Sequence, residues 1–297
     1  MERVSQHIVR HAQQLAREID ARAVVIYADA MRHDDELRQL LRVVDYPTIL
    51  VTRSREEAVP PGFESHVWVH VPAVHMTRAG QVKAALLVCL ARGVLQRGDR
   101  VLCLTGVDGS HALDTLLVLN LGTEPELFSL LDSFTFGGDV APEVFERALT
   151  LATQLAVEGR EGRPVGTVFV LGDSEQVLAR SRSLVLNPFQ GHPESERNIL
   201  DPSLEETVKE FSALDGAFVV RGDGVVLTAG TQLVPDAPYA LLSGGLGTRH
   251  AAAAGITAAT GAVAMCISQS TGTVSVFKAG QMVADIHRPT NGGRLAI

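Results

Sequence analysis

The feature that most constrains this fold is the alternation, along the first third of the chain, of short apolar runs with segments of helical periodicity. The first run, AVVIYA, has no polar alternation, which is typical of a strand buried on both faces. Strands are predicted at residues 23–28, 47–52, 66–72 and 99–106, and helices at 3–19, 34–44 and 77–96. Strands and helices in this order predict a parallel sheet with helices on both faces.

The rest of the chain is organised differently. Residues 122–142 are rich in Gly, Pro and acidic residues, as a linker would be, and RGDG at 221–224 is a hairpin signal. Strands are predicted at 167–172, 183–189, 217–222, 224–230, 262–268 and 273–280, and helices at 142–159 and 203–214. We therefore predict an α/β protein of two domains, 1–125 with the parallel sheet and 126–297 with a mixed sheet.

Charge and hydropathy limit the partners and the compartment. The net charge is −8 and Lys and Arg form no cluster, which disfavours nucleic acid because its phosphates require a basic face. The longest apolar run covers residues 84–91, whereas a bilayer span needs about 20 residues. The charged N-terminal segment lacks the apolar core of a signal peptide, and Cys89, Cys103 and Cys266 lack metal-ligand spacing. We expect a cytoplasmic protein with no membrane partner.

The stretch GGLGTRHAAAAG, residues 244–255, has the parts of an anion-binding site. A helix predicted to begin near Arg249 exposes its first backbone N–H groups and the positive end of its dipole. Gly247 allows close approach to the backbone, Arg249 can pair with phosphate oxygens, and Thr248 and His250 can donate hydrogen bonds. The alternative is a glycine-rich turn capped by Thr248, with the other side chains in solvent.

A second candidate is ALDGAFVV, residues 213–220, where Asp215 follows a predicted helix and precedes a strand. A carboxylate there can hold a divalent cation or accept a proton from a hydroxyl nucleophile. Gly216 and Ala217 leave room for a flat ligand. The alternative is ordinary turn chemistry, since Asp-Gly is a common turn pair.

Two weaker signals lie in the N-terminal part. TGVDGSH at 105–111 follows a strand and is predicted to open a helix, so it could hold an anion, although it lacks Lys and Arg. His66, His70 and His75 could bind a metal, or could belong to a half-exposed strand face.

LDGAFVV, followed by GTRHAAAAGI and AVAMCISQSTGTVSVFKAG, resembles the diadenylate cyclase domain over residues 127–290. ARGVLQRGDRVLCLTG at 91–106 is similar to the C-terminal domain of pyruvate kinase. That combination of domains resembles the archaeal-type diadenylate cyclases. The resemblance implies condensation of two ATP molecules into cyclic di-AMP and two pyrophosphates, with Mn²⁺ or Mg²⁺ as cofactor.

The resemblance also implies roles for individual residues. Asp215 would lie by the 3′-hydroxyl, bind the metal and help to deprotonate the nucleophile. Arg249 and His250 would join it as catalytic residues that hold the triphosphate and stabilise departing pyrophosphate. The backbone of Leu233 would face adenine. The implied ATP-binding set is Gly216, Ala217, Leu233, Gly247, Thr248, Arg249, His250 and Ser268.

Two departures from the family pattern keep a second interpretation open. Many members read Arg-His-Arg where this chain has Ala251, and Gln269 stands where an acid could bind metal. The alternative is a degenerate cyclase that senses ATP or cyclic di-AMP without turnover. A further hypothesis makes the N-terminal domain a receptor for a phosphorylated metabolite or an oligomerisation surface.

The stoichiometry predicts a homodimer or a higher homo-oligomer. One chain has one DGA and one GTRH sequence, hence one ATP site, while the product is two-fold symmetric. Two chains are therefore expected to meet with their sites apposed, in an isologous contact.

Overall fold

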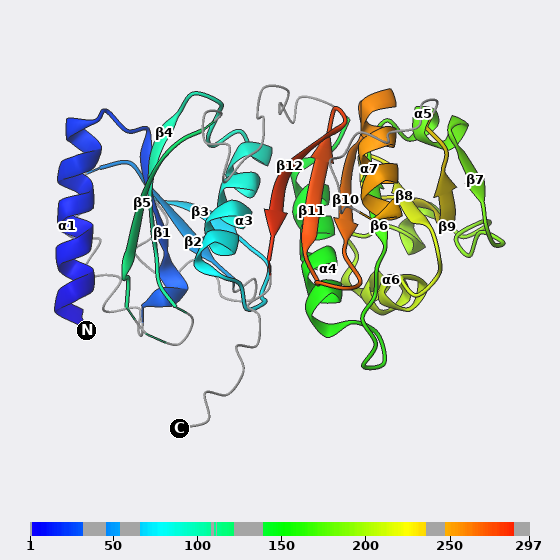
Figure 1. The fold of residues 1–297 in the computed structure, drawn as a ribbon, viewed down its shortest axis with the longest axis horizontal. Helices are drawn as coiled ribbons and strands as arrows, with labels where there is room; N and C mark the ends of the chain where they lie inside the picture. Colours follow the sequence, from blue (N-terminus) through cyan, green and yellow to red (C-terminus); the bar gives the residue numbers. More distant parts are fainter. Residues whose placement is uncertain are drawn as a thin grey trace. The chain divides into compact units, whose positions relative to one another are not determined.

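The computed structural model describes residues 2–31, 46–53, 66–107, 110, 112–121, 139–235 and 247–287 (Figure 1). The chain divides into two compact units, Met1–Leu131 and Asp132–Arg288. The boundary expected between residues 125 and 126 and the helix expected over 34–44 lie outside the described residues.

The first unit contains a five-stranded sheet in the order β3-β2-β1-β4-β5. The first four strands in this order are parallel to one another, as predicted. β1 and β2 are buried along their whole length, as is typical of parallel strands covered on both faces. The strands are β1 (Ala23–Tyr27), β2 (Thr48–Thr52), β3 (Val67–His70), β4 (Arg100–Thr105) and β5 (Thr115–Asn120).

The fifth strand corrects the sequence-based prediction of a helix after residues 105–111. Residues Thr115–Asn120 instead form β5, which pairs antiparallel with β4 at the edge of the sheet. Gly106 shows why the chain turns back there, since a Cβ on it would lie 2.0 Å from the carbonyl oxygen of Ala112. An anion site at the start of a helix is therefore not formed at this position.

Helices cover both faces of this sheet (Figure 1). Helix α1 (Glu2–Glu18) buries Val9, Ala12 and Ala16 against one face, as its periodicity predicts. Helix α3 (Arg78–Ala91) covers the other face, and its first turn is capped by the Thr77 hydroxyl, which accepts a hydrogen bond from Gly80 N at 3.1 Å. Among the described residues, no helix combines the length and apolarity needed to span a bilayer.

The second unit contains a seven-stranded mixed sheet in the order β12-β11-β10-β6-β8-β9-β7. Only β6 and β8 are parallel neighbours in this sheet, and the other pairs are antiparallel. Its strands are β6 (Val168–Leu171), β7 (Ser181–Ser183), β8 (Ala217–Val220), β9 (Val226–Leu233), β10 (Val263–Ile267), β11 (Val274–Lys278) and β12 (Gln281–Ile286).

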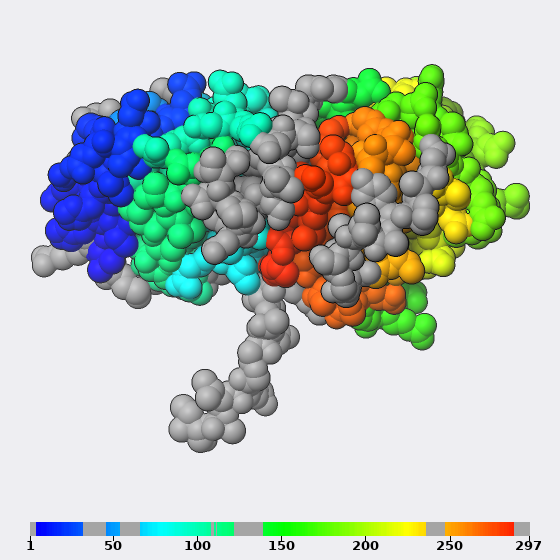
Figure 2. Space-filling model, turned by 45° about the horizontal axis from the view of Figure 1, so that its top comes forward, coloured from blue at the N-terminus to red at the C-terminus, as the bar shows by residue number. Residues whose placement is uncertain are grey.

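Two layers of helix enclose the second sheet. Helix α7 (Thr248–Ala259) packs Ala253, Ala254 and Ile256 on one face, against a cluster that includes Val168 and Val170. Helix α4 (Pro142–Glu158) contacts the same strands but contributes no residue to that cluster, so it covers the opposite face. In Figure 2 the orange surface of α7 and the red surface of β12 lie side by side. Shorter helices of this unit are α5 (Ser174–Ala179), α6 (Glu205–Phe211), η3 (Glu194–Glu196) and η4 (Pro202–Leu204). The short helix η1 (Ala28–Ala30) belongs to the first unit.

The strand predicted over residues 183–189 is wrong. A three-residue strand ends at Ser183, and Leu184 and Leu186 then project into solvent, the latter 97% exposed. The backbone turns at Asn187, whose side chain accepts a hydrogen bond from Phe189 N at 3.0 Å and donates one to the Leu227 carbonyl at 2.8 Å. An extended strand therefore does not continue through this residue. The apolar pattern of this segment is therefore not the pattern of a buried strand.

Candidate nucleotide site at one edge of the second sheet

The register of the second sheet brings distant parts of the sequence to one edge. Ser268 follows β10, and Ile267 N donates to the Thr167 carbonyl at 2.9 Å, which places Ser268 beside the start of β6. Because β6 and β8 are parallel, the start of β8 lies next, and the Thr167 hydroxyl donates to the Gly216 carbonyl at 3.3 Å. Asp215 immediately precedes this point.

The other strands end at the same edge. β11 begins where β12 ends, with Val274 opposite Ile286, so Thr273 and His287 are neighbours. β9 runs antiparallel to β8 and ends at Leu233, on the other side of Asp215. The edge therefore presents, in order across the sheet, His287, Thr273, Ser268, Asp215 and Leu233.

The two motifs expected to act together are in contact. Arg249 Nη2 lies 3.0 Å from Asp215 Oδ1, and the Asp215 side chain is 83% exposed. This ion pair joins the start of β8 to the first turn of α7. The Nε atom of Arg249 is buried and has no hydrogen-bond partner among the described residues. Arg249 thus retains a donor for a further acceptor.

Gly166 makes room for this arginine. A Cβ on Gly166 would lie 2.9 Å from Arg249 Nη1 and 2.9 Å from Gln269 Cβ. Only glycine fits without moving one of these groups. Gln269 is held in turn, because its side-chain nitrogen donates to the Pro164 carbonyl at 3.2 Å. The sequence showed no signal for Gly166, since its role depends on the position of a helix more than eighty residues away in sequence.

His250 is buried, unlike the two residues before it. Its Nε2 lies 3.3 Å from the Ser275 hydroxyl, and its ring meets Phe277 edge-on at a centroid distance of 6.0 Å. Burial lowers the pKa of His250, so its imidazole is uncharged at neutral pH. His250 can therefore supply a hydrogen bond at this site but not a positive charge.

The helix start differs by one residue from the expected position. Gly247 is the N-cap residue of α7 and Thr248 its first helical residue, and no side chain caps the helix. Thr248 therefore does not cap the turn, which was the alternative explanation for its presence. The first N–H groups of α7 point to the same edge, where the helix dipole favours an anion.

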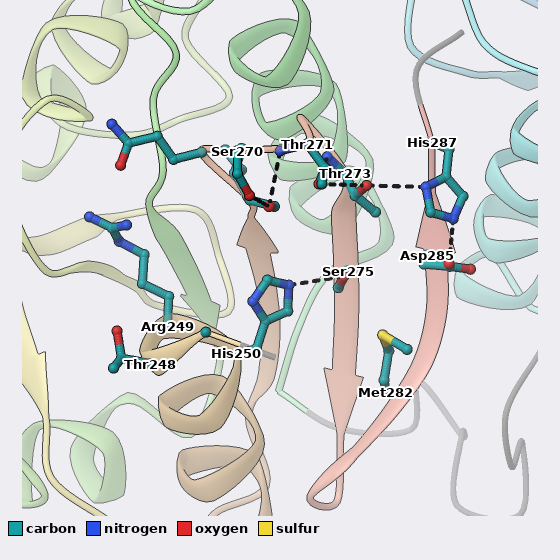
Figure 3. A pocket seen from close by; sticks show the side chains of 14 residues that line it. Thr248, Arg249, His250, Ser270, Thr271, Thr273, Ser275, Met282, Asp285 and His287 are labelled. Carbon is teal, nitrogen blue, oxygen red and sulfur yellow. Dashed lines mark hydrogen bonds and ion pairs between the residues drawn. The ribbon is translucent and has the colours of Figure 1, made fainter. Parts of the chain in front are cut away.

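The start of α7, the end of β10 and the loop after it line a cavity of about 630 Å³ (Figure 3). Its wall includes Gly247, Thr248, Arg249, His250 and Ser268 from the predicted set. It also includes residues that sequence analysis missed, which are Ile267, Gln269, Ser270, Thr271, Thr273, Ser275, Met282, Asp285 and His287. Hydroxyl groups, one guanidinium and a helix N-terminus form a site suited to phosphate oxygens.

Four predicted residues do not line this cavity, and Asp215 is one of them, although it pairs with Arg249 of the wall. Gly216 has a positive φ of 111°, and a Cβ on it would lie 2.6 Å from Thr231 N, so glycine is required by the backbone of β9. Ala217 and Leu233 are buried in the core cluster beneath α7. The structure therefore explains Gly216 by its backbone conformation and the close approach of β9, and not by room for a ligand.

The donor set for a divalent cation is small. No group of three or more His, Cys, Asp and Glu side chains that could hold a metal is found among the described residues, the histidines 66, 70 and 75 included. Asp215 offers one exposed carboxylate next to the phosphate-binding groups. A single carboxylate fits a cation of the Mg²⁺ type, which is usually bound by one or two carboxylates together with substrate phosphates.

Comparisons with known proteins match each of the two units to a family model. The family model described as "DisA bacterial checkpoint controller nucleotide-binding", the DAC domain, matches residues 154–282. The model described as "Probable sensor domain DacZ_P" matches residues 5–128. Most of the second unit therefore matches the DAC model, and most of the first unit matches the DacZ_P model.

Relatives extend the match to nearly the whole chain. A diadenylate cyclase of Methanocaldococcus jannaschii is 29% identical over 306 residues, which cover 94% of this chain and 96% of that protein. A diadenylate cyclase of Haloferax volcanii is 28% identical, over 90% of this chain and 93% of that protein. A pyruvate kinase from Cryptosporidium parvum aligns with a TM-score of 0.32 and 15% identity, over 39% of this chain and 22% of that chain. The chain is thus similar to archaeal diadenylate cyclases over nearly its whole length, and its two parts match the DacZ_P and DAC family models.

Proposed function

We propose that this chain condenses two ATP molecules into cyclic di-AMP and two pyrophosphates. The observation that carries the proposal is the ion pair between Asp215 and Arg249, of which Arg249 lines a hydroxyl-rich cavity. It joins a carboxylate able to accept a proton to a guanidinium able to bind phosphate. The match to the DAC family and the two archaeal cyclases support the same activity.

Different residues of the chain carry out different parts of this reaction. The Asp215 carboxylate accepts the proton of the ATP 3′-hydroxyl, and the 3′-oxygen forms a bond to the α-phosphorus of the other ATP. The bond from that phosphorus to the bridging oxygen breaks, and pyrophosphate leaves with the electron pair. Arg249, Thr248 and the first N–H groups of α7 bind the phosphates and stabilise the growing charge. Two such steps close the ring.

The adenosine half of ATP would occupy the edge near Asp215 and Leu233, with the phosphates directed toward Ser268. A divalent cation, Mn²⁺ or Mg²⁺, would be held by Asp215 and would neutralise phosphate charge. His250 would donate a hydrogen bond rather than charge, because burial lowers its pKa.

Incubation of the purified chain with ATP and either cation tests the activity. Cyclic di-AMP and pyrophosphate, identified by chromatography and mass, are the expected products. Bound ATP with no product in either cation would contradict the enzyme and favour the sensor interpretation, to which Ala251 and Gln269 pointed.

A homodimer with apposed sites is part of the proposal, since one chain holds one Asp215 and one Arg249. An equal mixture of Asp215→Asn and Arg249→Ala chains tests it. In a mixed dimer, one chain's Asp215 can activate attack on the ATP held by the other chain's Arg249, but the second step is blocked. The linear dinucleotide pppApA should accumulate in the mixture and in neither variant alone. Absence of the linear product would contradict the arrangement.

The first unit is proposed to act as a sensor, the role that the description of its matching family model suggests. Asp29, at the carboxyl end of β1, accepts hydrogen bonds from the Thr52 hydroxyl at 2.8 Å and from Arg53 N at 2.7 Å. Ligands of open α/β sheets bind at this edge of the strands. A thermal-shift screen of small metabolites against the full chain and an Asp29→Asn variant tests the role. A ligand whose shift does not depend on Asp29, or no shift at all, would contradict it.

The cytoplasm remains the proposed location. Cys89, Cys103 and Cys266 are free and buried, as expected in a reducing compartment. Alkylation of intact and unfolded protein isolated from cells tests the proposal, which predicts three free thiols after unfolding. A disulfide would contradict it.

A further inference from the structure

The far end of the cavity holds a hydrogen-bonded chain that the reaction as described does not use. His287 Nε2 lies 2.6 Å from Asp285 Oδ2, and His287 Nδ1 lies 3.1 Å from the Thr273 hydroxyl (Figure 3). The Thr271 hydroxyl donates to the Thr273 hydroxyl at 2.9 Å. Thr273 itself is buried, whereas His287 is half exposed.

The hydrogen-bonding capacity of Thr273 indicates which kind of ligand group this hydrogen-bonded chain can bind. A hydroxyl has one hydrogen to donate and two lone pairs to accept with. Thr271 occupies one lone pair. The contact with His287 involves the second site on Thr273: a protonated Nδ1 donates to the other lone pair of Thr273, whereas an unprotonated Nδ1 accepts the Thr273 hydrogen. In the first arrangement the hydrogen of Thr273 is its only remaining capacity, and an acceptor in the cavity can take it.

The position of Thr273 indicates which acceptor this is. Across the sheet the order from Asp215 is β8, β6, β10, β11 and β12, so Thr273 and His287 lie beyond Ser268. Neighbouring strands are about 4.8 Å apart, so β8 and β10 are separated by roughly 10 Å. A nucleotide whose ribose lies by Asp215 and whose phosphates reach Ser268 would direct its terminal phosphates toward Thr273.

Part of this hydrogen-bonded chain lies beyond the residues that the family model matches, although Thr271 and Thr273 lie within them. The DAC family model matches residues 154–282, and Asp285 and His287 follow this range. The hairpin between β11 and β12 brings them back to the cavity, because Lys278 pairs with Gln281 across a two-residue turn. Ala279 and Gly280 both have positive φ there, as a type I′ turn requires.

We propose that Thr273 binds the terminal phosphates of ATP and the pyrophosphate that leaves, and that His287 and Asp285 are positioning residues that commit the Thr273 hydroxyl to donation. The ligand class is an inorganic or nucleotide-borne polyphosphate. Its identity as pyrophosphate rests on the proposed function, whereas the anion site rests on the geometry. Arg249 and His287 lie on opposite sides of the hydroxyl-bearing loop (Figure 3), so Arg249 and the Thr273 hydroxyl that His287 positions would hold the polyphosphate from two sides.

The test measures the affinity of the full chain for inorganic pyrophosphate by calorimetry, with the divalent cation present. Thr273→Val should weaken binding about tenfold, as expected for loss of a hydrogen bond to a charged group, whereas Thr273→Ser should bind within about twofold of the wild type. His287→Gln should weaken binding several-fold. The double variant should bind no more weakly than Thr273→Val alone, because His287 acts through Thr273.

His192→Gln is the matched control. His192 also faces a carboxylate, with Nδ1 3.8 Å from Glu196 Oε2, but it does not line the cavity. Its substitution should leave pyrophosphate affinity unchanged. Equal affinity of Thr273→Val and the wild type, additive losses in the double variant, or no pyrophosphate binding by the wild type would each overturn the proposal. Cyclic di-AMP formation by the wild type is measured separately, so failure of the activity and failure of this site are distinguishable.

Discussion

Arg249 Nη2 lies 3.0 Å from Asp215 Oδ1, which joins two residues separated by a strand pair and a loop in the sequence. The contact places a carboxylate at the start of β8 within reach of the same ligand as the N-terminus of α7. The core does not confine Asp215, whose side chain is mostly exposed. A nucleotide can therefore replace part of this ion pair without disrupting the fold.

Replacement of Arg249 by lysine should lower kcat/KM for ATP about tenfold or more. Lysine keeps the charge but loses the planar fork that can serve Asp215 and a phosphate together. Steady-state kinetics on the variant checks this. Arg221→Lys is the control, because Arg221 forms comparable ion pairs with Glu194 and Asp223 at 2.6 and 2.8 Å in an exposed hairpin. Equal losses in both variants would contradict a specific role for Arg249.

His250 should make the protein less stable in acid. Burial lowers its pKa, so below the ordinary histidine pKa of about 6.5 the unfolded chain binds a proton that the folded chain does not. Stability is therefore lost as the pH falls through that value. The melting temperature of the wild type should drop more between about pH 7.5 and pH 5 than that of His250→Gln. Parallel curves would show that His250 titrates in the same way in both states.

Gly216→Ala separates two explanations of the DGA motif. The structure requires glycine there because φ is 111° and a Cβ would meet the Thr231 backbone at 2.6 Å. We expect a loss of about 1–3 kcal/mol in the free energy of unfolding, measured by urea denaturation. If glycine served only to admit the nucleoside, stability would be unchanged and only the affinity for ATP would fall.

Gly166→Ala should impair activity with little change in the melting temperature. Its Cβ would displace the Arg249 guanidinium and the Gln269 side chain, both of which line the cavity. KM for ATP should rise several-fold. Gly261→Ala is the matched control, since its Cβ would be 3.4 Å from Asp173 Oδ2 and distant from this wall. Full activity in Gly166→Ala would contradict the packing described for Arg249.

The sequence predicted those elements whose signals are local. Buried strands such as β1 and β6 and the amphipathic helix α1 follow from periodicity alone. The edge strand β5 was missed because the preceding Asp and Gly residues are typical of a helix start as well as of a turn. Leu184, Val185 and Leu186 are apolar but exposed, because the chain leaves the sheet after Ser183 and turns at Asn187.

The candidate site likewise contains some residues that the sequence identifies and others that it does not. Asp215 and Arg249 lie in motifs that the sequence identifies, and the sheet register brings them together. Thr273, Asp285 and His287 have no motif of their own. They meet only because β11 and β12 pair with Val274 opposite Ile286, a register that periodicity does not specify.

The most direct test of the central claim is production of cyclic di-AMP from ATP by the wild type, by Asp215→Asn and by Asp223→Asn. Asp223 is the matched control, because it too precedes a glycine in the second unit but pairs with Arg221 outside the cavity wall. We predict cyclic di-AMP from the wild type and Asp223→Asn, and a loss of roughly a hundredfold or more in Asp215→Asn with an unchanged fold. Undiminished product from Asp215→Asn would contradict the account.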